Sequence, residues 1–173
     1  MTTTAIRQVA SPSTADVEGL ADLLLACVEG GASVNFLWPM PRARAVDFWA
    51  KVARGVNAGE RVLLVAEDAD GLAGTVQIVM DLPENQPHRV DVAKLLVHPR
   101  ARRRGIAEAL MRAAEQAARE RGRTLMVLDT VTGSDAARLY ERLGWIRAGD
   151  IPGFALDPAG ALCSATYYYR QLT

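Results

Sequence analysis

One strand–helix–strand unit near the middle of the chain constrains the fold more than any other feature. The β-branched, apolar runs Arg89–Val97 and Thr124–Thr130 are each predicted to form a strand. Between them a helix is predicted to begin near Gly105, carry a stripe of Ile, Leu and Ala, and end near Gly122. A helix that joins two strands of one sheet is a crossover connection, so the sequence predicts an α/β or α+β protein with a mixed sheet.

The remaining elements are predicted from apolar periodicity and turn residues on either side of this unit. Helices are expected from the caps at Ser11–Thr14 to Gly30, from Pro41 to Asn57, and at Ser134–Leu143. Further strands are expected at Ile6–Val9, Arg61–Glu67, Leu72–Met80, Trp145–Ala148 and Ser164–Leu172. Because no repeat, low-complexity tract or Pro/Ser linker divides the chain, we expect residues 1–173 to form one domain.

Composition argues against several classes of partner. Lys and Arg together number 20, as do Asp and Glu, so the chain is neutral and lacks the basic field of a nucleic-acid or anionic-membrane binder. The cysteines Cys27 and Cys163 are too few for a disulfide framework or a zinc site, and no metal is expected. The start, Met1–Val9, has no apolar signal-peptide core, and no apolar run approaches about 20 residues, so we expect a cytoplasmic protein.

The neutral total hides a basic segment between Arg100 and Arg123, which holds eight arginines and three acidic residues. It begins just after the strand that ends at Val97, and the following helix starts with small residues at Gly105 and Ala107. Free N–H groups and the positive end of the helix dipole converge there, which makes the turn a candidate phosphate site. A solvated, arginine-rich helix start is the alternative. The glycine spacings of the common ATP and NAD motifs are absent, which argues against those nucleotides.

Two motifs together resemble the GNAT family of acetyltransferases. The first is the strand end and turn at residues 95–107, with the pattern Arg-x-x-Gly-x-Ala from position 102, and the second is the run 137–145 around Tyr140. The resemblance implies a mixed, mostly antiparallel sheet of about seven strands flanked by about four helices, splayed at the strands near residues 93 and 127. It also implies acetyl-CoA as cosubstrate, with its pyrophosphate bound at the turn.

Stretches outside these motifs, among them residues 30–34, 128–130 and 149–160, are similar to the tabtoxin-resistance branch of the family. That similarity implies acetyl transfer to a primary amine of a small, amino-acid-like or toxin-like molecule. A protein or peptide N-acetyltransferase of the same fold and a non-catalytic acyl-CoA-binding module are the alternatives. We expect a monomer or a homodimer, with neither nucleic acid nor a membrane as partner.

The phosphate-site argument and the resemblance together name the residues expected to bind acetyl-CoA. They are Leu95, Leu96, Val97, Arg102, Arg103, Arg104, Gly105, Ile106, Ala107, Ser134 and Tyr140. The resemblance implies that a backbone N–H at Leu95 or Leu96 faces the thioester carbonyl and that Tyr140 protonates the departing thiolate. A core aromatic is the alternative for Tyr140. Gly133 stands where many family members have Asn, so Ser134 is either a cofactor contact or a helix cap.

Asp129 and Asp91 are the candidate general bases. An amine with a lysine-like pKa is almost entirely protonated at pH 7, so acetyl transfer needs a base, acting directly or through water. A carboxylate within an apolar strand is costly unless its charge is used, which favours these two residues. The alternatives are that Asp91 pairs with a nearby Arg or Lys94 and that Asp129 caps the turn at 130–134.

The acceptor pocket is expected between the loop at 30–38 and the tail loop at 150–160. Three aromatic residues near the first loop, Phe36, Trp38 and Trp49, are candidates to line it. Packing in the core is the alternative for all three.

Overall fold

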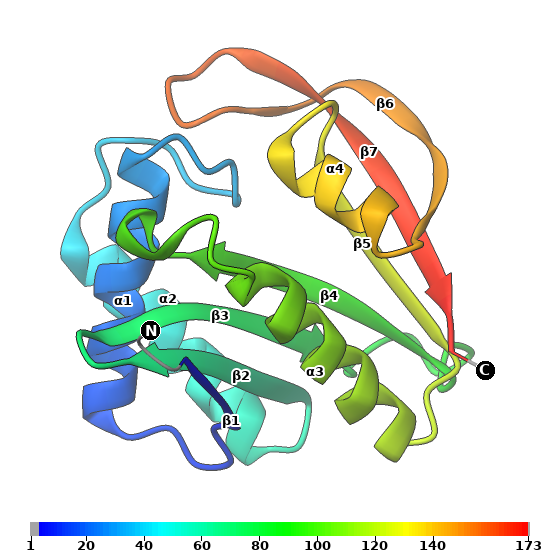
Figure 1. The fold of residues 1–173 in the computed structure, drawn as a ribbon, viewed down its shortest axis with the longest axis horizontal. Coiled ribbons are helices and arrows are strands. Elements are labelled where there is room, and N and C mark those ends of the chain that lie inside the picture. The colour runs from blue at the N-terminus through cyan, green and yellow to red at the C-terminus, as the bar shows by residue number, and fades with distance from the viewer. Residues whose placement is uncertain (1–3, 173) are drawn as a thin grey trace.

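A sheet of seven strands in the order β1-β2-β3-β4-β5-β7-β6 forms the centre of the fold (Figure 1). The computed structural model describes residues 4–172, so the ends of the expected domain, residues 1–3 and 173, lie outside the described residues. The strands are β1 (Ala5–Gln8), β2 (Arg61–Asp68), β3 (Gly71–Val79), β4 (Arg89–Val97), β5 (Leu125–Val131), β6 (Ile146–Leu156) and β7 (Leu162–Gln171). The helices are α1 (Thr14–Glu29), α2 (Arg42–Asn57), α3 (Ile106–Glu120) and α4 (Asp135–Arg142), with a 3-10 turn at Pro99–Ala101. The predicted mixed, mostly antiparallel sheet with flanking helices is confirmed.

Helices cover both faces of the sheet because its inner strands bury side chains on both sides. In β2, Val62 and Leu64 belong to the hydrophobic core that includes α3. Their neighbours Leu63 and Val65 belong to the core formed with α1 and α2. Side chains alternate between the two faces of a strand, so a continuous buried run such as that of β2 needs a layer of cover on each face. Both faces of the sheet are therefore packed against helices, which fixes the positions of its inner strands.

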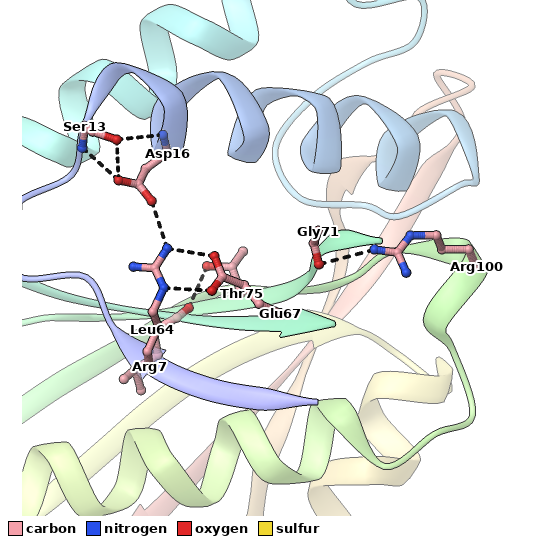
Figure 2. Close-up of polar contacts among 8 residues, drawn as sticks. All are labelled: Arg7, Ser13, Asp16, Leu64, Glu67, Gly71, Thr75 and Arg100. Carbon is pink, nitrogen blue, oxygen red and sulfur yellow. Dashed lines mark hydrogen bonds and ion pairs between the residues drawn. The ribbon is translucent and has the colours of Figure 1, made fainter. Parts of the chain in front are cut away.

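A network of ion pairs ties β1 to the start of α1 and to β2 (Figure 2). Arg7 donates to Glu67 at 2.7 Å and to Asp16 at 3.0 Å. Asp16 also forms a capping box with Ser13, whose hydroxyl accepts a hydrogen bond from the Asp16 N–H at 3.1 Å. The network therefore fixes the residue at which α1 begins and the edge of the sheet against which it lies.

The last two strands differ from the expectation for the C-terminal segment. β6 extends well beyond the expected Trp145–Ala148, so most of the expected tail loop at 150–160 is strand paired with β7. The turn-forming residues Pro152 and Gly153 lie where the register with β7 shifts. An edge strand tolerates proline and bulges because one side of its backbone needs no partner. Pro152 and Gly153 therefore interrupt the pairing of β6 without ending the strand.

β4 and β5 separate at the centre of the sheet. They are the one parallel pair among the described strands, and their register extends only from Arg89, opposite Leu125, to Asp91, opposite Val127. Beyond these pairs the two strands diverge toward α4 (Figure 1). The splay expected near residues 93 and 127 is thus present, and it leaves backbone groups of both strands without a neighbouring strand.

Gly74→Ala is expected to lower the free energy of unfolding by about 2 kcal/mol, because extra atoms in a packed core force neighbours apart. Gly74 lies in β3 beneath α3, where an added Cβ would be 2.8 Å from the Leu96 carbonyl oxygen. It would also lie 3.0 Å from a methyl carbon of Leu110 and 3.2 Å from one of Ile106. Urea denaturation of the variant and the parent protein measures the difference.

Gly19→Ala is the matched control for this prediction. Gly19 lies in α1, and its added Cβ would be 3.0 Å from the tip of the Leu72 side chain, which can rotate away. Alanine is also favoured over glycine in a helix by about 1 kcal/mol. Equal destabilisation by both variants would contradict the prediction for Gly74.

Candidate active site

A cleft of about 1020 Å³ opens where β4 and β5 diverge. The strand β4, the turn after it, the start of α3, the start of α4 and parts of β6 and β7 form its walls. Of the residues predicted to bind acetyl-CoA, those that line the cleft are Leu95, Leu96, Val97, Arg102, Arg103, Gly105, Ile106, Ala107, Ser134 and Tyr140. Two stretches of the chain, residues 95–107 and 134–140, are thus brought to one space.

The turn before α3 has the geometry of an anion site. Arg103 and Gly105 both adopt left-handed backbone conformations, with φ of 62° and 78°. Gly105 is the N-cap of α3 and has no side chain to occupy the N–H groups of the first helical turn. Those N–H groups have no partner within the helix, and the helix dipole is positive at this end. The backbone here can therefore hold a phosphate at the floor of the cleft.

The arginines of this turn divide into two groups with different partners. Arg100 and Arg104 both reach Asp68 of β2, at 2.8 Å and 3.2 Å. Arg100 also donates to the Gly71 carbonyl at 3.4 Å (Figure 2). Arg102 and Arg103, in contrast, line the cleft. The structure therefore places Arg104, which was expected among the cofactor residues, on Asp68 and outside the cleft lining.

β4 bulges where it borders the cleft. Leu96 lies opposite Thr75 of β3 and Ala93 lies opposite Gln77, so Lys94 and Leu95 together occupy the space of one residue. Lys94 takes a left-handed conformation with φ of 53°, which is uncommon for a residue with a side chain. The bulge takes the backbone of residues 94 and 95 out of the ladder, and both residues line the cleft.

Lys94 is a cleft residue that the sequence analysis did not name as part of the site. Its ammonium nitrogen lies 5.9 Å from the centre of the Phe36 ring and 5.6 Å from that of Phe48. Burial lowers the pKa of Lys94 to about 8, against the opposing attraction of Asp129, and the nearby Arg61 lowers it further. A lysine among the apolar residues 92–97, in a chain with only two lysines, was the signal available in the sequence.

Asp129 lies at the end of β5 and lines the cleft. Burial raises its pKa above the ordinary range, and the charge of Lys94 opposes this shift. The cap of the following turn is made by Ser134, which accepts a hydrogen bond from the Ala137 N–H at 3.1 Å and begins α4. Ser134, and not Asp129, is therefore the N-cap of α4.

Asp91 lies in β4 outside the cleft lining. Its carboxylate accepts a hydrogen bond from the guanidinium of Arg89 in the same strand. This is the pairing given as the alternative for Asp91. Of the two candidate bases, Asp129 therefore lines the cleft and Asp91 does not.

Tyr140 is carried by α4 and lies at the junction of the core and the cleft. It is 5% exposed, and its ring centre lies 5.8 Å from that of Trp145 and 5.9 Å from that of Tyr168. Burial, with a smaller effect of Asp129, raises the pKa of Tyr140 above its ordinary value. The phenol is therefore protonated at neutral pH, with its ring held by two aromatic neighbours.

Both segments of the expected acceptor pocket border the cleft, although none of the three aromatic candidates lines it. Residues 30–35 of the first loop and the β6 pair Phe154 and Ala155 line it. Trp49 is fully buried in the core, and Trp38 is exposed. Phe36 packs edge-on against Phe48 beside Lys94 and lies outside the cleft lining. The packing alternative therefore applies to Trp49 and Phe36, whereas Trp38 is neither buried nor part of the cleft lining.

Residues 4–172 contain neither a metal-binding cluster nor a helix that could span a membrane. No three His, Cys, Asp or Glu side chains in this range lie close enough to form a metal site. None of its helices combines the length and apolar character needed to cross a bilayer.

Lys94→Met is expected to raise the free energy of unfolding by about 2 to 3 kcal/mol at pH 7, since one pKa unit corresponds to about 1.4 kcal/mol. The folded pKa of Lys94, about 8, lies below its unfolded value of 10.5. The unfolded chain therefore binds more protons between these values, and the stability of the parent protein rises with pH across this interval. At pH 10 the difference in the free energy of unfolding between variant and parent should shrink to about 1 kcal/mol.

Urea denaturation at both pH values measures this difference. Lys51→Met, an exposed change in α2, is the matched control and should leave stability unaltered at both. A constant gap between Lys94→Met and the parent at pH 7 and pH 10 would contradict the prediction.

Comparison with known proteins identifies the family. Residues 19–145 match the model of the acetyltransferase (GNAT) family. An uncharacterised N-acetyltransferase of Azospirillum brasilense is 30% identical over 133 residues, covering 75% of this chain and 76% of that protein. Human N-acetyltransferase 8 is 36% identical over 87 residues, or 49% of this chain, and the matched part spans only 38% of the human protein.

Solved structures share the fold at low sequence identity. The structure of yncA from Salmonella typhimurium with its cofactor acetyl-CoA has a TM-score of 0.80 at 20% identity, covering 98% of this chain and 94% of that one. A ribosomal-protein-alanine N-acetyltransferase from Brucella melitensis has a TM-score of 0.79 at 20% identity, covering 97% and 99%. The family match, the relative in Azospirillum and the shared fold lead to one conclusion: this chain belongs to the GNAT family, whose members transfer an acetyl group from acetyl-CoA.

Proposed function

We propose that this chain, acting as one domain, acetylates a primary amine of a small molecule by direct transfer from acetyl-CoA. The observation that carries the proposal is the shared cleft. An anion-binding turn, a bulged strand with free backbone groups, a carboxylate of raised pKa and a buried phenol all border it. The similarity of residues 30–34, 128–130 and 149–160 to the tabtoxin-resistance branch supports an amino-acid-like or toxin-like acceptor.

The anion-binding turn is proposed to hold the pyrophosphate of the donor. The N–H groups at the start of α3 bind its oxygens, and Arg102 and Arg103 neutralise its charge. The side chain of Arg104 forms an ion pair with Asp68, so its proposed role is to stabilise the conformation of the turn. The pantetheine arm then extends between β4 and β5, where the two strands are not paired with each other.

The bulge in β4 is proposed to stabilise the oxyanion that forms during transfer. A backbone N–H at Leu95 or Leu96 donates to the thioester carbonyl oxygen. A donor in this role is worth about 3 kcal/mol in the transition state, because its strength grows as negative charge develops on the oxygen.

Asp129 and Tyr140 are proposed to carry the proton transfers. Asp129 takes a proton from the ammonium, directly or through one water, and its raised pKa brings it closer to the range of a useful base. The neutral amine forms a bond to the thioester carbon, and the bond from carbon to sulfur then breaks. Tyr140 donates its proton to the departing thiolate. The nitrogen loses its second proton as the amide forms, and this proton restores the phenol, while the proton taken up by Asp129 is released to solvent.

The test is a panel of small amines and short peptides incubated with the protein and acetyl-CoA. Release of free thiol is followed with a thiol reagent, and the acetylated product is identified by mass spectrometry. We expect thiol release that depends on a small amine. Acetylation of peptides alone would favour a protein N-acetyltransferase. Binding of acetyl-CoA without acceleration by any amine or peptide would favour the non-catalytic acyl-CoA-binding module.

A further inference from the structure

Lys94 and Asp129 place two opposite charges on the wall of one cleft without pairing them. Both residues line the cleft. Each affects the pKa of the other, so they lie within electrostatic reach. Yet among the ion pairs of residues 4–172, defined by a separation of at most 4.0 Å, none joins these two side chains. Neither charge is therefore neutralised by a direct ion pair with the other.

The surroundings of Lys94 favour an anion as its partner. The ammonium of Lys94 lies beside the Phe36 and Phe48 rings, which carry no negative charge. Arg44 of α2 lies 5.7 Å from the centre of the same Phe36 ring, and Arg61 of β2 adds a further positive field. Asp129 is the acid that acts on Lys94. An ammonium held among apolar rings and like charges gains most from an incoming carboxylate.

The same charges set the orientation of an acceptor. A protonated amine is repelled from the side of Lys94 and attracted to Asp129, which is the proposed base. A carboxylate on the same small molecule is attracted in the opposite direction. The bulge that displaces Lys94 also presents the backbone of Leu95 to the cleft, so the two ends of the acceptor would be fixed beside the reacting carbonyl.

We propose that Lys94 binds the carboxylate of the acceptor and thereby selects amino acids over amines that lack an anionic group. The inference rests on the proposed function, because it assigns a specificity-determining residue to that reaction. Lys94 recognises the end of the acceptor that does not react, and Asp129 receives the end that does.

The first test compares amino acids with their carboxamides as acceptors. Glycine and glycinamide, L-methionine and L-methioninamide, and L-lysine and L-lysinamide are assayed as matched pairs by thiol release. The ratio of kcat/KM for acid over amide should fall about 10- to 100-fold in Lys94→Met, the range for losing a hydrogen bond to a charged group. Lys94→Arg should restore part of the ratio. Lys51→Met, which changes an exposed side chain of α2, should leave the ratio unchanged.

The second test observes Lys94 itself, without turnover. The chain has two lysines, Lys51 and Lys94, so labelling lysine with ¹³C at Cε yields two resonances, which the two methionine variants assign. In the presence of CoA, the three amino acids should shift the Lys94 resonance and raise its titration midpoint from about 8, and the three carboxamides should not. The Lys51 resonance should not move with either set.

These tests separate failure of the inference from failure of the proposed function. Turnover of the amines with the same preference for acid over amide in the parent protein and Lys94→Met would overturn the role of Lys94 and leave acetyl transfer intact. Absence of turnover with every amine would contradict the proposed function, and the resonance of Lys94 would still decide whether the site binds a carboxylate. An unmoved Lys94 resonance with all three amino acids would overturn the inference.

Discussion

Tyr140→Phe is expected to lower kcat by about 100-fold, the lower end of what a positioned acid contributes, while the dissociation constant of acetyl-CoA stays within about threefold. The substitution removes one oxygen from a side chain whose ring is held by Trp145 and Tyr168. Within residues 4–172 this hydroxyl forms no hydrogen bond with another side chain, so its loss leaves no partner unsatisfied. Steady-state thiol release and acetyl-CoA titration measure the two quantities.

Tyr168→Phe is the matched control for Tyr140. It makes the same change in the same aromatic group, but Tyr168 lies outside the cleft lining and its hydroxyl donates to Glu141 at 2.8 Å. We expect this variant to lose stability and to keep its kcat. If kcat fell equally in both variants, the effect would come from packing of the aromatic group and not from proton donation by Tyr140.

Gly105→Asp is expected to weaken acetyl-CoA binding by at least 100-fold, which corresponds to about 2.8 kcal/mol. The new carboxylate would lie at the N-cap of α3, among the N–H groups proposed to hold the pyrophosphate. It would occupy those donors as a helix cap and repel the phosphate charges. An added Cβ at Gly105 has no atom within 4 Å, so the space admits the side chain. Calorimetric titration with CoA measures the affinity without turnover.

Gly105→Asn is the control that isolates the charge. Asparagine has the size of aspartate and tolerates the left-handed φ of 78° found at this position. Its affinity for CoA should fall by about 10-fold or less. Equal loss in both variants would attribute the effect to the side chain's bulk, and unchanged affinity in both would remove the turn from the cofactor site.

The features that could be predicted from the sequence are those in which local chemistry and long-range packing agree. The helix after Gly105 has a strong apolar stripe and a glycine at its start, and α3 lies where this pattern predicts it. The cleft residues of the turn follow from that position, because the first turn of a helix exposes its N–H groups whatever the rest of the fold does. Gly105, Ile106 and Ala107, at the start of α3, all line the cleft.

The features that could not be predicted depend on partners distant in the chain. Arg104 is indistinguishable from Arg103 in the sequence, and only the position of Asp68 on β2 separates the two. The extent of β6 depends on pairing with β7, which overrides the turn residues at 152 and 153. The importance of Lys94 comes from the bulge and from Phe36 and Phe48, which lie far from it in sequence. In each case a long-range contact decides the role.

The turn before α3 is proposed to recognise a part of the donor that the reaction leaves unchanged. Free CoA keeps the same pyrophosphate after the acetyl group has gone, so on this proposal the backbone at Gly105 would bind the product by the same contacts as the donor. Of the contacts proposed here, only the hydrogen bond at the β4 bulge depends on the acetyl carbonyl. Product inhibition by CoA should therefore be strong, and flux through the enzyme in a cell should follow the ratio of acetyl-CoA to free CoA and not the concentration of acetyl-CoA alone.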